Sequence, residues 1–406
     1  MQVELSEARS RAVARFYRPE LDVVRFIAFL AVYLDHTLPR TDDPRIDHLF
    51  KGLAPTFYAA ADASAFGLSL FFVLSAFLIC ELLLRELQAS RTVKVKQFYI
   101  RRILRIWPLY YFGLALGVVF ALLPGGHRNS LAPIGWFAVF GGSWFCALSG
   151  WIQNPIVPLW SISVEEQFYL FAPWIVKYFN RKMLYAFCLF LLLIANGQLY
   201  SLGWHRVNGN RVWCDSFVQL ECFAAGILLC LSLRGRVPRI VAWQRLALIA
   251  GALSFCFFAC FCLNCQFEYS PANPGGWPLI GGYALAAAGS VMILIAFLGI
   301  APSALPGWAI YLGRISFGLY VYHEFAISIV NRAQIGRLLF NSVSNYPLRI
   351  CLNTGLTLGL PLGLTLLAAV LSYRYLETPF LRMKMRHSVI ESQPIVGIDP
   401  ALPTRL

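Results

Sequence analysis

The sequence predicts an all-α protein, a polytopic integral membrane helix bundle with about ten transmembrane helices and one short broken or re-entrant segment. Of the 406 residues, 58% are hydrophobic and 13% are charged, whereas soluble domains contain about 25% charged residues. Apolar runs follow one another through nearly the whole chain, and the mean hydropathy is +0.63. The basic residues behind the net charge of +14 sit in short loops between these runs. That placement fits the positive-inside rule and argues against a nucleic-acid partner.

The first apolar stretch, residues 21–38, carries ionisable groups in an otherwise lipid-compatible helix. It reads LDVVRFIAFLAVYLDHTL. Arg25 and His36 are eleven residues apart, so about three helical turns and roughly 16 Å separate them on one face. Ionisable groups in a membrane usually face a protein interior or a water-filled cavity. The pattern suggests that an anion is held at one level and a proton is handled at another. The simpler interpretations are an Arg25–Asp22 pair and a structural histidine.

The charges of the first loops set the orientation of the chain. Residues 1–20 are basic and are expected in the cytoplasm, so the first span runs outward; no cleavable signal peptide is expected. The loop 39–64 is acidic, and a second span covers about 65–84. The loop 85–105 is the most basic of the chain and is therefore cytoplasmic; its basic residues are Arg85, Arg91, Lys94, Lys96, Arg101, Arg102 and Arg105.

The remaining apolar runs complete ten crossings. The segment 134–149 is short and glycine-rich, so we expect it to be broken or non-spanning. Further spans are expected near residues 106–123, 160–177, 183–201, 216–233, 246–265, 278–299, 311–330 and 348–371. Both termini then lie in the cytoplasm, residues 21–380 form one membrane domain, and 381–406 form a tail. The loop 331–347, with Arg332 and Arg337, is basic on the predicted outer side and fits the rule poorly.

The cysteines do not predict a metal site. Most of the eleven lie in apolar runs, where cysteine acts as a small hydrophobic residue. Cys262 and Cys265 form a C-x-x-C pair without a second pair or a neighbouring histidine. We therefore expect no metal cofactor.

A basic motif, FYIRRILRIWP, enters the third span. Arg101 and Arg105 are four residues apart and share a helical face, and Arg102 is offset by about 100°. A cytoplasmic basic flank is the simpler interpretation. The functional one is a phosphate clamp, because guanidinium groups bind phosphate oxygens with two hydrogen bonds.

Two further motifs place polar residues in apolar spans. In PLWSISVEEQFYLFAP, Glu165 and Glu166 stand at the head of a span, where they either cap the helix or serve a catalytic site. In LGRISFGLYVYHEF, Ser316 and His323 are seven residues apart and face the same way, and Arg314 is a second intramembrane arginine. In SYRYLETPFLR, an Arg374–Glu377 pair has a structural interpretation.

These segments together resemble the membrane acyltransferase-3 family of bacterial O-acyltransferases. The motifs LDVVRFIAFLAVYLDH, LSAFLIC, FYIRRILRIWP, LWSISVEEQFYLFAP, LGRISFGLYVYH and SYRYLETPF occur in the family's order over residues 21–380. Some members carry a C-terminal SGNH-type domain; this sequence is expected to be a short form without one.

The resemblance implies roles for particular residues. His36 resembles the family's catalytic histidine, with Glu165 or Glu166 orienting it, and Arg25 resembles its paired arginine. Acyl-CoA phosphates would bind the cluster Arg101, Arg102 and Arg105, with Arg25 or Arg314. Asp35, Trp160, Ser316 and His323 would support the site or bind substrate. Many members have an aromatic residue where this chain has Asp35, so whether Asp35 tunes His36 stays open.

The function that the resemblance implies is transfer of an acyl group, by default acetyl, from cytosolic acyl-CoA to a hydroxyl. The acceptor is expected to be a carbohydrate, a lipid-linked glycan or a small metabolite, reached at or beyond the outer face of a bacterial inner membrane. His36 would act as general base. The alternative is a proton-coupled transporter or exporter of a small anion or metabolite, with Arg25, His36 and the glutamates lining its path.

Overall fold

The computed structural model describes residues 16–39, 43, 46–47, 50–265, 274–335, 339, 346–388 and 390. Over these residues the regular structure is helical and contains no strand. The longer helices are α2 (Pro19–Thr37), α5 (Gly67–Ser90), α6 (Val95–Leu122), α9 (Trp160–Tyr178), α10 (Arg181–Trp204), α12 (Leu220–Leu233), α13 (Ala242–Phe261), α14 (Gly276–Phe297), α16 (Ser316–Ala333) and α18 (Tyr346–Ser372). The shorter helices are α4 (Ala54–Ala63), α7 (Leu131–Ala138), α8 (Gly142–Ser149), α11 (Gly209–Cys214), α15 (Gly307–Arg314) and α19 (Thr378–Met385).

Six described helices are long and apolar enough to cross a membrane, which confirms the predicted polytopic helical fold. They cover Ala54–Ser90, Val95–Leu122, Arg181–Trp204, Ala242–Phe261, Gly276–Phe297 and Leu352–Met385. Four other predicted spans are also helices, α2, α9, α12 and α16, but each is too short, too highly charged or not apolar enough to be counted with these six. For example, α12 has 14 residues and is about 21 Å long, less than a hydrocarbon core of about 30 Å. Ten crossings therefore remain a prediction.

The structure changes the predicted helix boundaries at several places. Most of the expected loop 85–105 is helical, since α5 continues to Ser90 and α6 begins at Val95. The expected loop 39–64 contains helix α4, which continues into α5 with only a 3₁₀ turn, Ser64–Phe66, between them. The expected span 216–233 begins at Leu220, because the Asp215 carboxylate accepts the backbone N–H groups of Phe217 and Val218 and forms a turn. The expected span 311–330 is interrupted at Ile315, between α15 and α16.

The segment 134–149 is broken, as predicted. Helices α7 and α8 have eight residues each and are separated by Val139–Gly141. Phe140 has φ of +56°, in the left-handed region where a helix cannot continue. Whether this pair crosses the membrane stays open.

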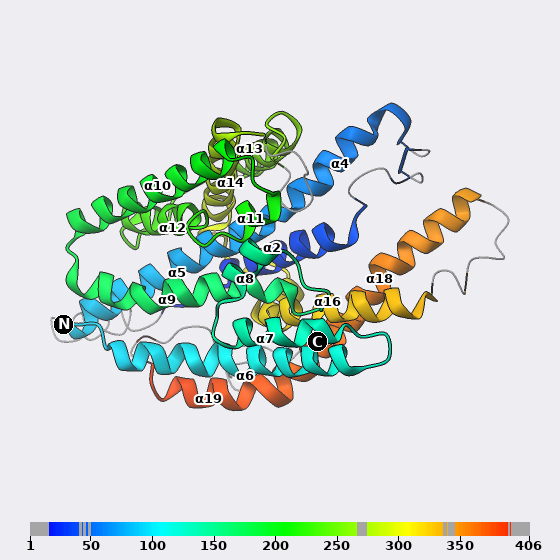
Figure 1. The fold of residues 1–406 in the computed structure, drawn as a ribbon. Coiled ribbons are helices and arrows are strands. Elements are labelled where there is room, and N and C mark those ends of the chain that lie inside the picture. The colour runs from blue at the N-terminus through cyan, green and yellow to red at the C-terminus, as the bar shows by residue number, and fades with distance from the viewer. Residues whose placement is uncertain are drawn as a thin grey trace.

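Helix α2 lies at the centre of the bundle. It packs against α5, α14, α15 and α16, and it runs through the middle of Figure 1. Two glycines permit close approach to its backbone. A Cβ atom on Gly67 would lie 2.6 Å from the carbonyl oxygen of Ala28, and one on Gly313 would lie 1.8 Å from that of Asp22. Ionisable residues on α2 are thereby enclosed by other helices.

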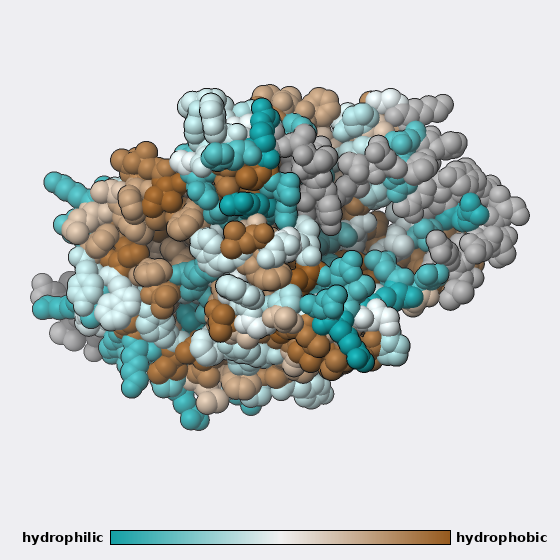
Figure 2. Space-filling model, viewed as in Figure 1, coloured by the Kyte–Doolittle hydropathy of each residue, from teal (hydrophilic) through white to brown (hydrophobic). Residues whose placement is uncertain are grey.

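The periphery carries large apolar side chains, as expected for a surface in lipid. On α10, Leu189, Phe190 and Leu193 are exposed. Figure 2 shows apolar side chains spread over the visible face of the molecule. Helices α6 and α19 pack together along one edge of the view in Figure 1. The predicted cytoplasmic segment 1–20 is described only from Phe16, and the tail 381–406 only at 381–388 and 390.

Candidate active site

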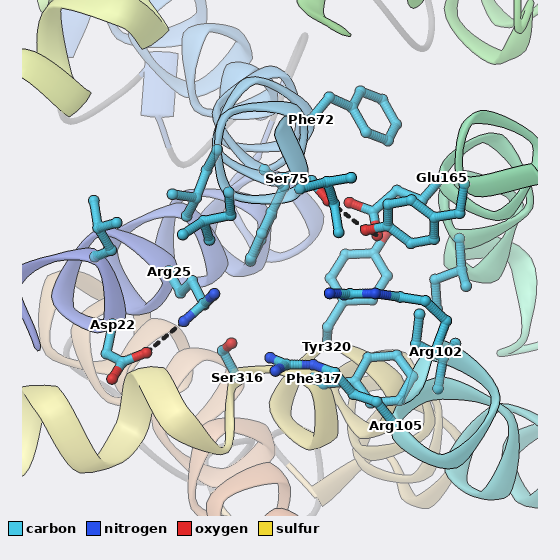
Figure 3. A pocket seen from close by; sticks show the side chains of 18 of the residues that line it. Asp22, Arg25, Phe72, Ser75, Arg102, Arg105, Glu165, Ser316, Phe317 and Tyr320 are labelled. Atoms are coloured by element: carbon cyan, nitrogen blue, oxygen red, sulfur yellow. Dashed lines mark hydrogen bonds and ion pairs between the residues drawn. The ribbon is translucent and has the colours of Figure 1, made fainter. Parts of the chain in front are cut away.

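A cavity opens beside the first turns of α2, between α2, α5, α6, α9, α16 and α19 (Figure 3). Five cationic side chains line it, against two carboxylates; these residues are Arg18, Arg25, Arg102, Arg105, Lys384, Asp22 and Glu165. Figure 3 shows Arg25 on one side of the cavity and Arg102 and Arg105 on the other, with their guanidinium groups pointing toward one another. Ser316 also lines the cavity. The arrangement is an electropositive pocket with an apolar lining.

Arg25 is anchored to its own helix. It donates from Nη1 to Asp22 Oδ1, three residues earlier, so the pairing expected from the spacing is present. Asp22 also accepts from the Tyr17 hydroxyl at 3.0 Å. Burial and the neighbouring Asp22 carboxylate raise the pKa of Tyr17, and its phenol therefore keeps the proton that it donates. Arg25 is thus held with its guanidinium turned to the cavity.

Arg314 contacts both Tyr17 and Asp22. Its Nη2 donates to the Tyr17 hydroxyl oxygen at 2.6 Å, and its Nε lies 3.8 Å from Asp22 Oδ2. It is buried at the end of α15 and is not among the residues that line the cavity. The structure therefore places Arg314 as a support for Tyr17 and Asp22 rather than as a cavity residue.

The three arginines of α6 point in two directions. Arg102 and Arg105 line the cavity. Arg101, which the helical spacing grouped with Arg105, donates instead to Glu86 Oε2 at 2.7 Å and to the carbonyl oxygen of His387 at 3.0 Å. Residues three apart, such as Arg102 and Arg105, share a helix face just as residues four apart do. The contacts of Arg101 with Glu86 of α5 and with His387 after α19 turn Arg101 away from Arg105. Arg101 therefore ties α6 to its neighbours.

The cavity holds cations without carboxylate partners. Within the described residues, Arg102, Arg105 and Lys384 form no ion pair, and the buried Arg102 Nε has no hydrogen-bond partner. The Arg102 guanidinium lies over the Tyr169 ring, 5.4 Å from its centroid. Buried charges are normally paired, so a group of cations in this state favours binding of an anion from outside the protein.

The two adjacent glutamates of α9, Glu165 and Glu166, have different hydrogen-bond partners. Glu165 lines the cavity and accepts from the Tyr169 hydroxyl at 3.1 Å; that hydroxyl also contacts Ser75 Oγ. Glu166 accepts from Trp107 Nε1 at 3.3 Å. The polar contacts of the two glutamates run to Trp107 of α6 and Tyr169 of α9, and none in the described residues joins them to His36. Trp160 is buried and packs edge-on against Trp213, away from the cavity lining.

A second cluster surrounds His36, near the other end of α2. His36 Nδ1 lies 3.6 Å from Glu324 Oε2, and His36 Nε2 lies 3.9 Å from Asp35 Oδ2. The rings of His36 and His323 meet edge to face with centroids 5.0 Å apart. His323 is fully buried, and its Nδ1 lies 2.5 Å from the carbonyl oxygen of Tyr320. The structure therefore brings His36, His323 and Asp35 together and adds Glu324.

Three residues of this cluster, His36, His323 and Glu324, could together hold a metal ion. One ligand atom each from His36, His323 and Glu324 lies within 4.8 Å of the others. Acid–base chemistry suits the imidazole and carboxylate groups as they stand.

Tyr320 links the cavity to the histidine cluster. Its side chain lines the cavity, and its hydroxyl bonds to Ser161 Oγ at 2.6 Å and to the Pro158 carbonyl at 2.8 Å. Its own carbonyl oxygen contacts His323 Nδ1. Helix α16 thus carries Ser316 at the level of Arg25 and His323 at the level of His36, so α2 and α16 together span both levels.

The family model described as an acyltransferase domain matches residues 18–371. The chain belongs to the acyltransferase-3 family. This match includes α2, α6, α9 and α16, the helices that carry most of the cavity and the histidine cluster. The resemblance of the six sequence motifs is therefore confirmed.

Curated relatives of this acyltransferase-3 chain include O-acetyltransferases. It is 25% identical to peptidoglycan O-acetyltransferase OatA of Listeria monocytogenes over 403 residues, covering 91% of this chain and 57% of the relative. It is 23% identical to O-acetyltransferase OatA of Staphylococcus aureus over 341 residues, covering 77% of this chain and 52% of the relative. The chain thus spans little more than half the length of these relatives. No solved structure matches it.

Sequence reasoning about this acyltransferase-3 chain missed four residues of the site. Tyr169 could have been found as the helical neighbour of Glu165, four positions on, and Glu324 directly follows His323. Ser75 lies in the quoted motif LSAFLIC but was assigned no role. Lys384 lies after the last motif, and nothing in its local pattern separates it from a basic flank.

Proposed function

We propose that this chain is a membrane O-acyltransferase that moves an acetyl group from cytosolic acyl-CoA to a hydroxyl of a carbohydrate or glycoconjugate acceptor. The observation that carries the proposal is the arrangement along α2. A cavity lies at its first turns, and within the described residues its Arg102, Arg105 and Lys384 form no ion pair. An imidazole flanked by carboxylates lies about three turns further. Family membership and O-acetyltransferase relatives support the reaction class.

The donor would bind through its phosphates in the cavity. Acyl-CoA carries several phosphate charges, which would neutralise Arg102, Arg105 and Lys384, with Arg25 opposite them. Arginine suits this role because its planar fork makes paired hydrogen bonds to phosphate oxygens. Arg101 and Arg314 would act indirectly, by holding α6 and Tyr17 in place. Glu165 and Tyr169 would contact the uncharged part of the donor.

The pantetheine arm would then run along α2 toward His36. The separation of Arg25 and His36, roughly 16 Å along the axis, is a distance that an extended arm spans. Binding in this direction would put the thioester at the histidine level. The basic loop at the cavity end supports a donor on the cytoplasmic side. The acceptor would approach from the outer face.

His36 would act as the general base. One ring nitrogen takes the proton of the acceptor hydroxyl as its oxygen attacks the thioester carbonyl carbon. The C–S bond then breaks, coenzyme A leaves as a thiolate, and the thiolate takes up one proton. A positioned base typically contributes 10²–10⁴-fold to the rate. His323 and Ser316 would support the site from α16.

The test uses the full chain in nanodiscs with radiolabelled acetyl-CoA and a panel of glycan acceptors. We expect acetyl esters on the acceptor with the wild type and at least about a 10²-fold loss with His36→Gln. Near-wild-type transfer by that variant would refute the proposed base. Proton-coupled flux in liposomes without any acetyl transfer would instead establish the transporter interpretation and reject the enzyme.

A further inference from the structure

Tyr169 lies where the charge of the cavity changes sign. The Arg102 guanidinium lies over its ring, 5.4 Å from the centroid, and its hydroxyl donates to Glu165 Oε2 at 3.1 Å. All three side chains line the cavity. Figure 3 shows Ser75 and Glu165 with their side chains directed toward one another, and Arg102 beside them. A cation therefore lies on one side of Tyr169 and a carboxylate on the other.

Glu165 lies between the arginines and the histidine cluster. Ser161, Glu165 and Tyr169 follow one another at intervals of four residues on α9, so they share a face and are spaced about 6 Å apart along the helix axis. Ser161 Oγ bonds to the Tyr320 hydroxyl, and the Tyr320 carbonyl contacts His323 of the histidine cluster. A ligand that extends from the arginines toward the histidine cluster therefore passes Glu165.

The hydrogen-bond chain at Glu165 ends in an acceptor. The Tyr169 hydroxyl has a single hydrogen, which goes to Glu165, so Ser75 Oγ donates to the Tyr169 oxygen in their mutual contact. Both hydroxyl hydrogens are thereby used within the chain. A carboxylate has about four lone-pair positions, and Tyr169 occupies one of them. This part of the cavity therefore suits a ligand group that donates an O–H or an N–H.

Aromatic rings line the cavity near the histidine cluster. Phe71 and Tyr320 both belong to the lining, and their rings pack edge to face with centroids 5.9 Å apart. A phosphate at this depth would meet the Glu165 carboxylate, and like charges at short distance repel. Pantetheine has apolar carbons, a hydroxyl and amide N–H groups, and it carries no charge. Its chemistry therefore matches both the rings and the carboxylate.

We propose that Glu165 sets the position of the donor in the cavity, in that its carboxylate accepts a hydrogen bond from the pantetheine arm of acyl-CoA and excludes the phosphates from this part of the cavity. This inference rests on the proposed function, which supplies acyl-CoA as the donor. The phosphates then stop at Arg102 and Arg105, and the arm continues toward the histidine cluster. In this role Glu165 is a specificity-determining residue that contacts the donor rather than His36.

The assignment can be tested with ligands that differ only in whether they carry the arm. Coenzyme A has phosphates and the arm, whereas adenosine 3′,5′-bisphosphate has phosphates alone. Isothermal titration calorimetry on the full chain in nanodiscs gives Kd for each ligand. We expect Glu165→Ala to raise Kd for coenzyme A about tenfold, the value of one hydrogen bond to a charged group, and not to raise Kd for the bisphosphate. Arg102→Ala should raise Kd for both ligands.

Conservative variants separate contact with the arm from a structural role. Glu165→Gln keeps an acceptor oxygen and should recover part of the affinity for coenzyme A. Tyr169→Phe removes the hydroxyl that holds Glu165 and should raise Kd for coenzyme A alone; Tyr178→Phe, exposed on the same helix, is its control and should match the wild type. A comparable rise for the bisphosphate in Glu165→Ala, or an unchanged Kd for coenzyme A, overturns the role of Glu165. A wild type that binds neither ligand overturns the proposed function instead.

Discussion

Gly313 lies directly against the backbone of Asp22, so closely that a Cβ atom there would fall 1.8 Å from the Asp22 carbonyl oxygen. This contact brings Arg314, the next residue, to Tyr17 and Asp22. The geometry of the cavity therefore depends on a glycine that touches no ligand.

Gly313→Ala should destabilise the protein and weaken donor binding. The added methyl group meets backbone, which cannot rotate away, so we expect a loss of about 3 kcal/mol, at the upper end for overpacking. Thermal unfolding in detergent measures it. Gly307→Ala is the matched control on α15, because its Cβ would meet nothing within 4 Å and alanine favours a helix. Equal melting temperatures for the two variants would contradict the role of this contact.

Arg102→Ala and Arg101→Ala should fail in different ways. Removing Arg102 from the cavity should raise KM for acetyl-CoA about 10- to 10²-fold, the value of one or two hydrogen bonds to a charged group, and leave folding nearly unchanged. Removing Arg101 leaves the buried Glu86 carboxylate without its cation and should cost about 3–5 kcal/mol of stability. Kinetics and unfolding measured on both variants check this contrast. A larger KM effect from Arg101 would reverse our assignment of the α6 face.

Lys384→Met should stabilise the free protein and weaken coenzyme A binding. Lys384 is buried among arginines, and replacing a buried charge by an apolar side chain of similar size is often stabilising. We expect Tm without ligand to rise by about 1–3 °C and Kd for coenzyme A to rise about tenfold, or 1.4 kcal/mol. Lys96→Met, at an exposed position in the first turn of α6, should change neither quantity. A lower Tm with unchanged affinity would mean that Lys384 has a structural partner.

Tyr17→Phe should change the alkaline stability of the protein. Burial and Asp22 raise the pKa of Tyr17 above its ordinary value of 10.0. The unfolded state therefore loses this proton first as pH rises above about 10, and the wild type loses stability there. The variant lacks the phenol, so it should be less stable than the wild type at pH 7 and decline less steeply above about pH 10. Unfolding midpoints from pH 7 to 11 test it; parallel curves would rule the linkage out.

Local sequence predicted the helices better than their ends. The apolar runs and the basic loops identified the polytopic helical fold and nearly every long helix. The prediction missed α4, because residues 39–64 were assigned to a loop from their acidic charge. It also missed the break at Ile315, since an apolar run continues through it.

The sequence also predicted only part of the candidate site. Periodicity correctly put Arg25 and Asp22 on one face of a helix. It could not choose which α6 arginines face the cavity, because positions 101, 102 and 105 satisfy helical spacing in more than one way. It assigned the orienting carboxylate to Glu165 or Glu166, whereas among the described residues Glu324 and Asp35 lie beside His36.

By itself, the sequence determined what depends on neighbours along the chain: helical class, family, membrane character and the two levels on α2. Only the tertiary structure decided what depends on helices distant in sequence, namely the cavity formed by Arg102, Arg105 and Lys384 and the meeting of His36 with Glu324. The physical reason is that a helix repeat fixes the direction of a side chain within its own helix, whereas its partners are set by how other helices pack against that face.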